Sequence, residues 1–104
     1  MIVAVNRIFV KPEYREPFEQ RFRERERLVE TMPGFIQIQI LRPTTGDDYL
    51  VMTWWESKEA FERWTNSEEF QRGHSRGASK EWFSRPNEFQ LYEVLDSHPT
   101  GAEA

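Results

Sequence analysis

Residues 33–64 read PGFIQIQILRPTTGDDYLVMTWWESKEAFERW, and this stretch decides most of the fold. Alternating side chains predict a strand over residues 35–42, and an extended aromatic-rich run predicts a second strand over residues 49–55. The turn residues of the 43–48 segment join the two strands as an antiparallel hairpin. Ser57 has a side chain that caps helices, so a helix is expected to begin there.

Two helical segments follow the hairpin. The inward face of the first carries Ala60, Phe61 and Trp64. The inward face of the second, which starts at a cap in residues 66–69, carries Phe70, His74 and Ala78. A single straight helix would leave Trp64 and His74 roughly 80° apart around its axis. A break at residues 65–67 instead allows both side chains to reach one site.

Outward from this stretch, residues 2–10 predict a strand covered on both faces, because apolar side chains occupy both sets of alternate positions. Residues 13–32 predict a helix that Pro33-Gly34 ends. The stripe of this helix consists of Phe18, Phe22, Arg25, Val29 and Met32. Residues 88–95 alternate as the last strand. The segment 79–87 before it is expected to be a loop that is anchored by Trp82 and Phe83 and ends at Pro86-Asn87.

The elements follow in the order strand, helix, strand, strand, helices, strand. This order predicts an α+β fold of the ferredoxin-like, split βαβ type, with a four-stranded antiparallel sheet and helices on one face. A chain of 104 residues can form one modest core. We therefore expect a single domain over residues 1–96 and a flexible tail over residues 97–104.

The composition argues against several classes of function. A net charge of −4 disfavours nucleic acid as a partner, because phosphate binding needs a basic face. No apolar run is long enough to span a membrane, and residues 1–7 lack a signal-peptide pattern. The chain has no cysteine, which excludes thiolate chemistry and favours a cytoplasmic location. Eight Phe, four Trp and three Tyr indicate an aromatic pocket or interface.

The predicted sheet has apolar side chains on both faces, although helices cover only one. The uncovered face would form an exposed apolar patch of several hundred Å². A second copy of the chain, related by a two-fold axis, is the simplest cover, and we expect a homodimer. The alternative is that the 79–87 loop, with Trp82 and Phe83, folds over this face.

Three residues stand out as candidates for chemistry, since the chain lacks phosphate-loop, nucleophile-elbow and zinc-protease motifs. Asn6 lies in mid-strand, where burying its amide without partners costs about 1–3 kcal/mol. His74 points inward between two nearby glycines, and Trp64 lies on the preceding helix. Each also has a purely structural interpretation as a packed or hydrogen-bonded core residue. Together they suit a planar redox cofactor whose iron takes one imidazole.

These residues carry a family resemblance over residues 3–95. The sequence resembles the haem-degrading monooxygenases of the Isd type, within the antibiotic biosynthesis monooxygenase superfamily. The resemblance is densest at residues 32–35, 41–43 and 53–64, and within these the Pro33-Gly34-Phe35 turn and the W-E-S-x-E-A-F stretch of residues 55–61 occur across the superfamily. The specific signal is the set Asn6, Trp64 and His74, in which the histidine follows the tryptophan by ten residues.

The resemblance implies a dimeric α/β barrel with one haem per subunit, the haem being both substrate and cofactor. His74 would bind the iron, Trp64 would distort the ring, and Asn6 would hydrogen-bond on the oxygen-binding side. Phe22 and Arg25 match residues that line the pocket of some members. The expected reaction opens the haem ring with dioxygen and an electron donor and releases iron. The alternatives are a cofactor-independent monooxygenase of small aromatic substrates and a non-enzymatic dimer that binds haem or another ligand.

Overall fold

The computed structural model describes residues 1–75 and 80–98, with only the backbone described at residues 73–75. The four strands are β1 (Ile2–Val10), β2 (Phe35–Leu41), β3 (Asp48–Trp55) and β4 (Phe83–Glu93). The α-helices are α1 (Arg15–Arg23), α2 (Lys58–Thr65) and α3 (Glu68–Ser75). Three short 3-10 helices complete the described elements, namely η1 (Pro12–Tyr14), η2 (Val29–Thr31) and η3 (Lys80–Trp82).

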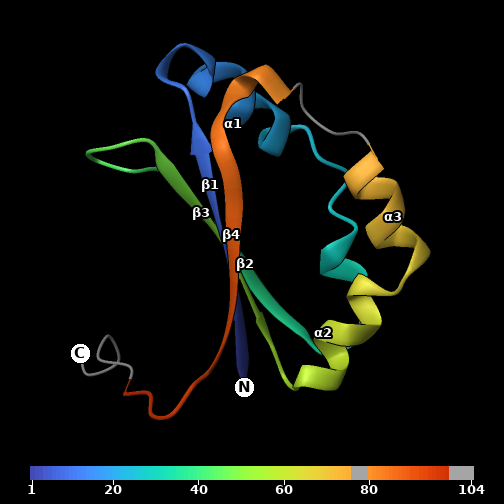
Figure 1. Ribbon diagram of the computed structural model, residues 1–104. Coiled ribbons are helices and arrows are strands. Elements are labelled where there is room, and N and C mark those ends of the chain that lie inside the picture. The colour runs from blue at the N-terminus through green and yellow to red at the C-terminus, as the bar shows by residue number, and fades with distance from the viewer. Residues whose placement is uncertain (76–79, 99–104) are drawn as a thin grey trace.

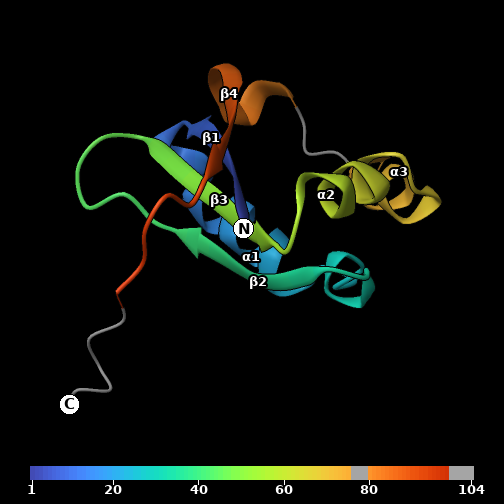
Figure 2. The ribbon, with the colours of Figure 1, turned by 90° about the horizontal axis from the view of Figure 1, so that it is seen from below.

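The strands form one antiparallel sheet in the order β2-β3-β1-β4, and the helices lie on one side of it (Figures 1 and 2). This arrangement confirms the predicted ferredoxin-like α+β fold. β1 lies inside the sheet, where Asn6 is opposite Val51 of β3 and Phe89 of β4. Among the described residues, no helix is long and apolar enough to cross a membrane.

The turn before β2 is fixed by Gly34. Its φ of +84° is a conformation that residues with a Cβ rarely adopt. A Cβ built on Gly34 would also lie 2.5 Å from the Cβ of Ala60 on α2. The carbonyl oxygen of Gly34 accepts a hydrogen bond from the backbone N–H of Glu56 at 2.8 Å. The close approach allowed by this glycine therefore joins the turn to the start of α2.

The predicted helix caps and the predicted break between α2 and α3 are confirmed. The Oγ of Ser57 accepts a hydrogen bond from the backbone N–H of Ala60 at 3.1 Å. The Oγ of Ser67 accepts one from the backbone N–H of Phe70 at 3.0 Å. These bonds place the end of α2 and the start of α3 on either side of the 65–67 segment.

The prediction of one helix over residues 13–32 is wrong. After η1, helix α1 ends at Arg23, and a connection over residues 24–28 leads into η2. The guanidinium of Arg25 turns back and donates to the carbonyl oxygen of Phe22 at 3.0 Å, occupying a helix-end carbonyl. Arg27 then adopts a φ of +59°, outside the right-handed helical region. The apolar stripe continues nonetheless, because Val29 still packs into the core.

The prediction of a loop over residues 79–87 is also wrong where the structure describes it. Residues 80–82 form η3, and β4 already begins at Phe83. Pro86 lies within β4 because this strand is at the edge of the sheet, where a missing N–H donor is tolerated. The early start of β4 brings Asn87 into the sheet. The predicted roles of Trp82 and Phe83 as anchors are confirmed by their packing against buried Val10, Phe18 and Tyr49.

Two separate apolar clusters lie at opposite ends of β1, on the side of the sheet that faces the helices. The first contains Ile2, Val29, Trp55, Ala60 and Trp64. The second contains Val10, Phe18 and Tyr49, with Phe22, Trp82 and Phe83 packed against it. The middle of β1, around Asn6, therefore lies between two cores.

The opposite face of the sheet, here called the outer face, carries Val3, Val5, Leu50, Met52, Trp54 and Tyr92 by the strand register. Tyr92 is 53% exposed. The side chains of Trp82 and Phe83 pack beside Tyr14 and Phe18 on the helix side. The interpretation in which the 79–87 loop covers the outer face is therefore wrong.

Candidate functional site

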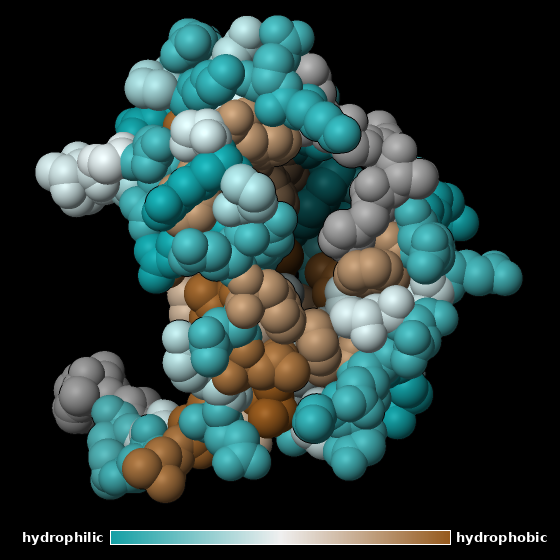
Figure 3. Space-filling model, viewed as in Figure 1, coloured by the Kyte–Doolittle hydropathy of each residue, from teal (hydrophilic) through white to brown (hydrophobic). Residues whose placement is uncertain are grey.

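A cavity of about 760 Å³ lies between the sheet and the helical layer. The space-filling view shows a hollow between β4 and the α2–α3 layer, with hydrophobic side chains along part of its border (Figure 3). Its size is within the range of about 300–1,000 Å³ that is typical of small-molecule and cofactor sites. The cavity lies against the middle of β1, between the two apolar clusters.

The sheet forms one wall of the cavity. The apolar part of this wall consists of Ala4, Ile8, Ile38, Val51 and Phe89. Its polar residues are Asn6, Thr53 and Asn87. The Oγ1 of Thr53 accepts a hydrogen bond from the indole Nε1 of Trp55 at 2.9 Å. The Oδ1 of Asn6 accepts one from the Nδ2 of Asn87 at 2.6 Å.

Aromatic residues of α2 and α3 form the opposite wall. Trp64 is 8% exposed and meets Phe70 edge-to-face, with ring centroids 5.3 Å apart. Phe61 stacks on Phe89 of β4, with centroids 5.8 Å apart. Such pairs add to the energy of apolar burial and fix the orientation of the rings. The wall that Trp64 presents to the cavity is therefore rigidly supported.

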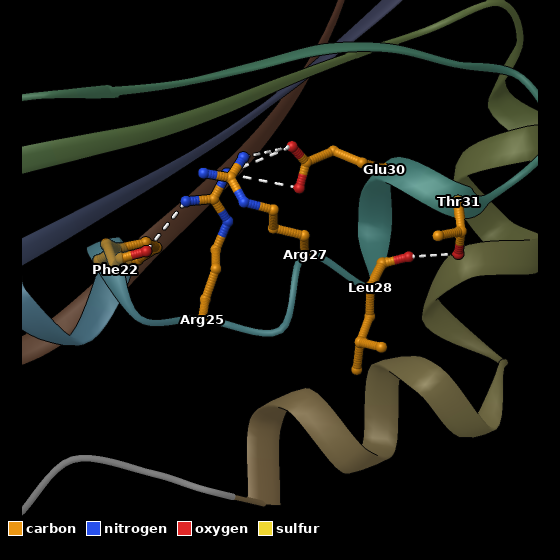
Figure 4. Close-up of polar contacts among 6 residues, drawn as sticks. All are labelled: Phe22, Arg25, Arg27, Leu28, Glu30 and Thr31. Carbon is orange, nitrogen blue, oxygen red and sulfur yellow. Dashed lines mark hydrogen bonds and ion pairs between the residues drawn. The ribbon is translucent and has the colours of Figure 1, made fainter.

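The connection after α1 forms a charged rim, shown in Figure 4. The Arg25 Nη2 lies 3.4 Å from a carboxylate oxygen of Glu30, and the Arg27 Nη1 lies 3.3 Å from the other. The Nε of Arg25 is buried, and no partner for it exists among the residues that the structure describes. An unpaired buried donor is costly, so this nitrogen is a site where an acceptor from outside the chain would be favourable.

The first helix is held against the sheet by a clamp of Glu19, Arg42 and Tyr49. The Arg42 Nε and Nη2 donate to the Glu19 carboxylate at 2.7 and 2.6 Å, and the Tyr49 hydroxyl donates to it as well. These bonds, Arg42 first, lower the pKa of Glu19 from 4.5 to about 2. Burial, followed by the bond to Glu19, raises the pKa of Tyr49. The clamp fixes the helix that carries Phe22 and leads to Arg25.

The structure brings four of the five predicted site residues to this one cavity. Asn6, Phe22, Arg25 and Trp64 all line it. His74 lies on α3, the helix whose Phe70 also lines the cavity, but the side chain of His74 is outside the described residues. Ala78 of the predicted stripe is outside them as well.

Sequence reasoning missed Asn87 and Arg21, which also line the cavity. Pro86-Asn87 has the composition of a turn, so Asn87 was expected at the end of a loop. A signal was present in the alternation, because Asn87 is two residues before Phe89, which faces the cavity. Arg21 lies within a segment of alternating charges that is typical of a solvated helix face.

Comparison with known proteins agrees with the family resemblance of the sequence. The family profile described as antibiotic biosynthesis monooxygenase matches residues 1–76. A haem oxygenase (mycobilin-producing) from Mycobacterium tuberculosis is 44% identical over 66 residues, which are 62% of this chain and 63% of that protein. The match thus spans less than two thirds of the relative's length. A haem oxygenase (staphylobilin-producing) from Staphylococcus haemolyticus is 36% identical over 77 residues, covering 71% of this chain and 73% of that protein.

A solved structure agrees over almost the whole chain. It is that of the haem-degrader MhuD from Mycobacterium tuberculosis with two haems bound in its active site. The TM-score is 0.80 and the identity 32%, and the match covers 95% of this chain and 100% of the other.

Proposed function

This chain belongs to the antibiotic biosynthesis monooxygenase family, and from that premise we propose that it binds haem and opens the ring oxidatively. The reaction would use dioxygen and an electron donor and would release the iron. The haem would serve as both substrate and cofactor. The observation that carries the proposal is that Asn6, Phe22, Arg25 and Trp64, from separate segments, line one cavity of about 760 Å³.

The character of the cavity fits haem. The macrocycle is flat and apolar, and the aliphatic and aromatic walls match it on both sides. Haem also carries two propionate groups, which need cationic partners. Arg21, Arg25 and Arg27 lie at the cavity, and Arg25 has a buried Nε without a partner among the described residues. An entering carboxylate would satisfy that donor.

Each residue has a proposed role that follows from its position. Bound haem would supply the iron that activates dioxygen. We assign the iron-binding imidazole to His74 on α3, the helix next to the aromatic wall. Trp64 would press on the ring, since its own orientation is fixed by the edge-to-face contact with Phe70 and by packing in the first apolar cluster. Asn6 would direct its amide toward the oxygen-binding side, and Arg25 and Phe22 would hold the edge of the ring.

The proposal includes a homodimer formed through the outer face. That face presents Val5, Met52, Trp54 and neighbouring apolar side chains, none of them covered by a described helix. Burying it against a second copy removes apolar surface from water at about 25 cal/mol per Å². A two-fold axis allows the same surface to serve both partners.

Titration of the apoprotein with hemin tests the function. We expect a Soret band that saturates at one haem per chain and bleaches when a reductant and oxygen are added. His74→Ala should abolish the ferric spectrum of an imidazole-ligated haem. His98→Ala is the matched control, because His98 lies beyond β4 and pairs with Asp96 at 3.0 Å.

Each alternative has its own outcome in the same experiment. A parent protein that gives no Soret band refutes haem binding and favours a cofactor-independent oxygenase. A band that forms but never bleaches with any reductant refutes the enzyme and leaves a binding protein. If the spectrum survives in His74→Ala, the assignment of the iron ligand is wrong.

A further inference from the structure

We propose that Asn87 is a positioning residue, which fixes the orientation of the Asn6 amide toward the haem. The inference rests on the proposed function and extends it to a residue on a different strand. It begins with the hydrogen bond of 2.6 Å from the Asn87 Nδ2 to the Asn6 Oδ1. Both side chains line the same cavity.

The register of the sheet explains why these two side chains meet. Asn6 is directly opposite Phe89 on β4, so Asn87, two residues earlier, projects from the same face as its diagonal neighbour. A register irregularity in the β1–β4 ladder follows immediately, between Arg7 and Phe9. Pro86 restricts the backbone just before Asn87. Asn87 is thus held beside Asn6 by the backbone on both strands.

A free asparagine amide has no preferred orientation of its own. Rotation about its terminal torsion is broad and roughly two-fold, which exchanges the oxygen and nitrogen positions. With the bond from Asn87 in place, the Oδ1 of Asn6 faces Asn87. The Nδ2 of Asn6 then lies on the other side of the amide group. Among the residues whose side chains the structure describes, 1–72 and 80–98, nothing accepts a hydrogen bond from this nitrogen.

The other residues of the sheet wall make the orientation of the Asn6 amide important for a bound ligand. The Thr53 hydroxyl accepts from Trp55, the Nδ2 of Asn87 bonds to Asn6, and the remaining wall residues around Asn6 are apolar. Beside the Thr53 hydroxyl, which keeps its own proton, the Asn6 Nδ2 is therefore a donor on this wall that can face a ligand. A donor in a dry site stabilises developing negative charge, whereas the amide oxygen in the same place would oppose it.

The test uses the full-length protein loaded with haem, reduced and exposed to carbon monoxide. A hydrogen-bond donor near the bound carbon monoxide lowers its C–O stretching frequency, so infrared spectra report which end of the Asn6 amide faces the ligand. Asn87→Ala should raise and broaden the stretch, because the amide then samples both orientations. Asn87→Asp, which has almost the same shape, should raise it further, because its carboxylate accepts from the Asn6 Nδ2 and turns the Asn6 oxygen inward.

The same variants should keep hemin affinity within about twofold and bleach about three- to tenfold more slowly. Gln71→Ala is the matched control, since Gln71 carries an exposed amide on α3 and does not line the cavity. In the Asn6→Ala background, Asn87→Ala should have no further effect on either the stretch or the rate. Such non-additivity is expected only if Asn87 acts through Asn6.

An unchanged stretch in both Asn87 variants overturns the inference. An Asn87→Ala effect of full size in the Asn6→Ala background also overturns it, because Asn87 would then act on its own. If Asn6→Ala leaves the stretch unchanged, both the proposed role of Asn6 and the inference about Asn87 are refuted. Failure of the parent protein to bind hemin overturns the proposed function itself.

Discussion

Replacing Glu19 with glutamine should destabilise the protein most at neutral pH and least in acid. The Glu19 carboxylate accepts two hydrogen bonds from Arg42 and one from Tyr49, and its pKa is lowered from 4.5 to about 2. By linkage, a pKa lowered in the folded state stabilises the protein above the unfolded pKa of 4.5. That stability is lost as the pH falls from 4.5 through about 2, and only below about 2 is Glu19 mostly protonated in both states.

The magnitude follows from the same values. A pKa change from 4.5 to about 2 corresponds to about 3 kcal/mol if none of it is screened. The Arg42 side chain is 65% exposed, so water screens much of this interaction, and we expect about 1–2 kcal/mol at pH 7.

Urea denaturation, followed by tryptophan fluorescence between pH 7 and about pH 3, measures the difference between parent and Glu19→Gln. Glu16→Gln, an exposed change on the same helix, is the matched control and should have little effect. A Glu19→Gln loss that stays constant across this pH range would contradict the reasoning. A loss no larger than that of the control at pH 7 would also contradict it.

Three further changes test the packing, the site and the assembly. Gly34→Ala should cost about 2–4 kcal/mol in urea unfolding, because the new Cβ meets Ala60 at 2.5 Å on a backbone with φ of +84°; a stable variant would show that the turn can move away from α2. Trp64→Ala should lose about 3 kcal/mol of stability and still give a Soret band with hemin, but should bleach far more slowly. A parental bleaching rate would make Trp64 purely structural. Val5→Asp should convert a dimer into a monomer of 12.5 kDa in light scattering, and a parent that is itself monomeric at micromolar concentration refutes the outer-face interface.

Much of the architecture could be predicted because local signals and burial patterns agree. The hairpin between β2 and β3, the Ser57 cap and the break before α3 each follow from residues within a few positions of the feature. The end of α1 did not follow from such signals. The stripe of Phe22, Arg25 and Val29 keeps a helical spacing across the end of the helix, where the Arg25 side chain bonds to the carbonyl of Phe22 and Arg27 has a φ of +59°. Periodicity alone cannot distinguish a continuous helix from a connection whose next apolar residue packs in the same core.

The site residues show the same contrast between local signals, which the sequence carries, and tertiary contacts, which it does not. Asn6 could be singled out because a polar amide is unusual in the middle of a strand, and the structure places it in the cavity wall. Its partner Asn87 was missed because the Pro86-Asn87 pair predicts a turn, and this outweighed the signal of its two-residue spacing from Phe89. The unpaired Nε of Arg25 is a tertiary feature that no sequence pattern reports.

The two apolar clusters at opposite ends of β1 also have a consequence for how the molecule unfolds. Without a ligand, the ends of the domain are coupled mainly through the strands, since the cavity separates their cores. A ligand that fills the cavity would contact both clusters and merge them into one cooperative unit. At a hundredfold excess over its Kd, it would add about 2.7 kcal/mol to the free energy of unfolding. The lifetime of the folded chain would then follow the supply of that ligand, so that consuming the ligand also removes part of the protein's own stability.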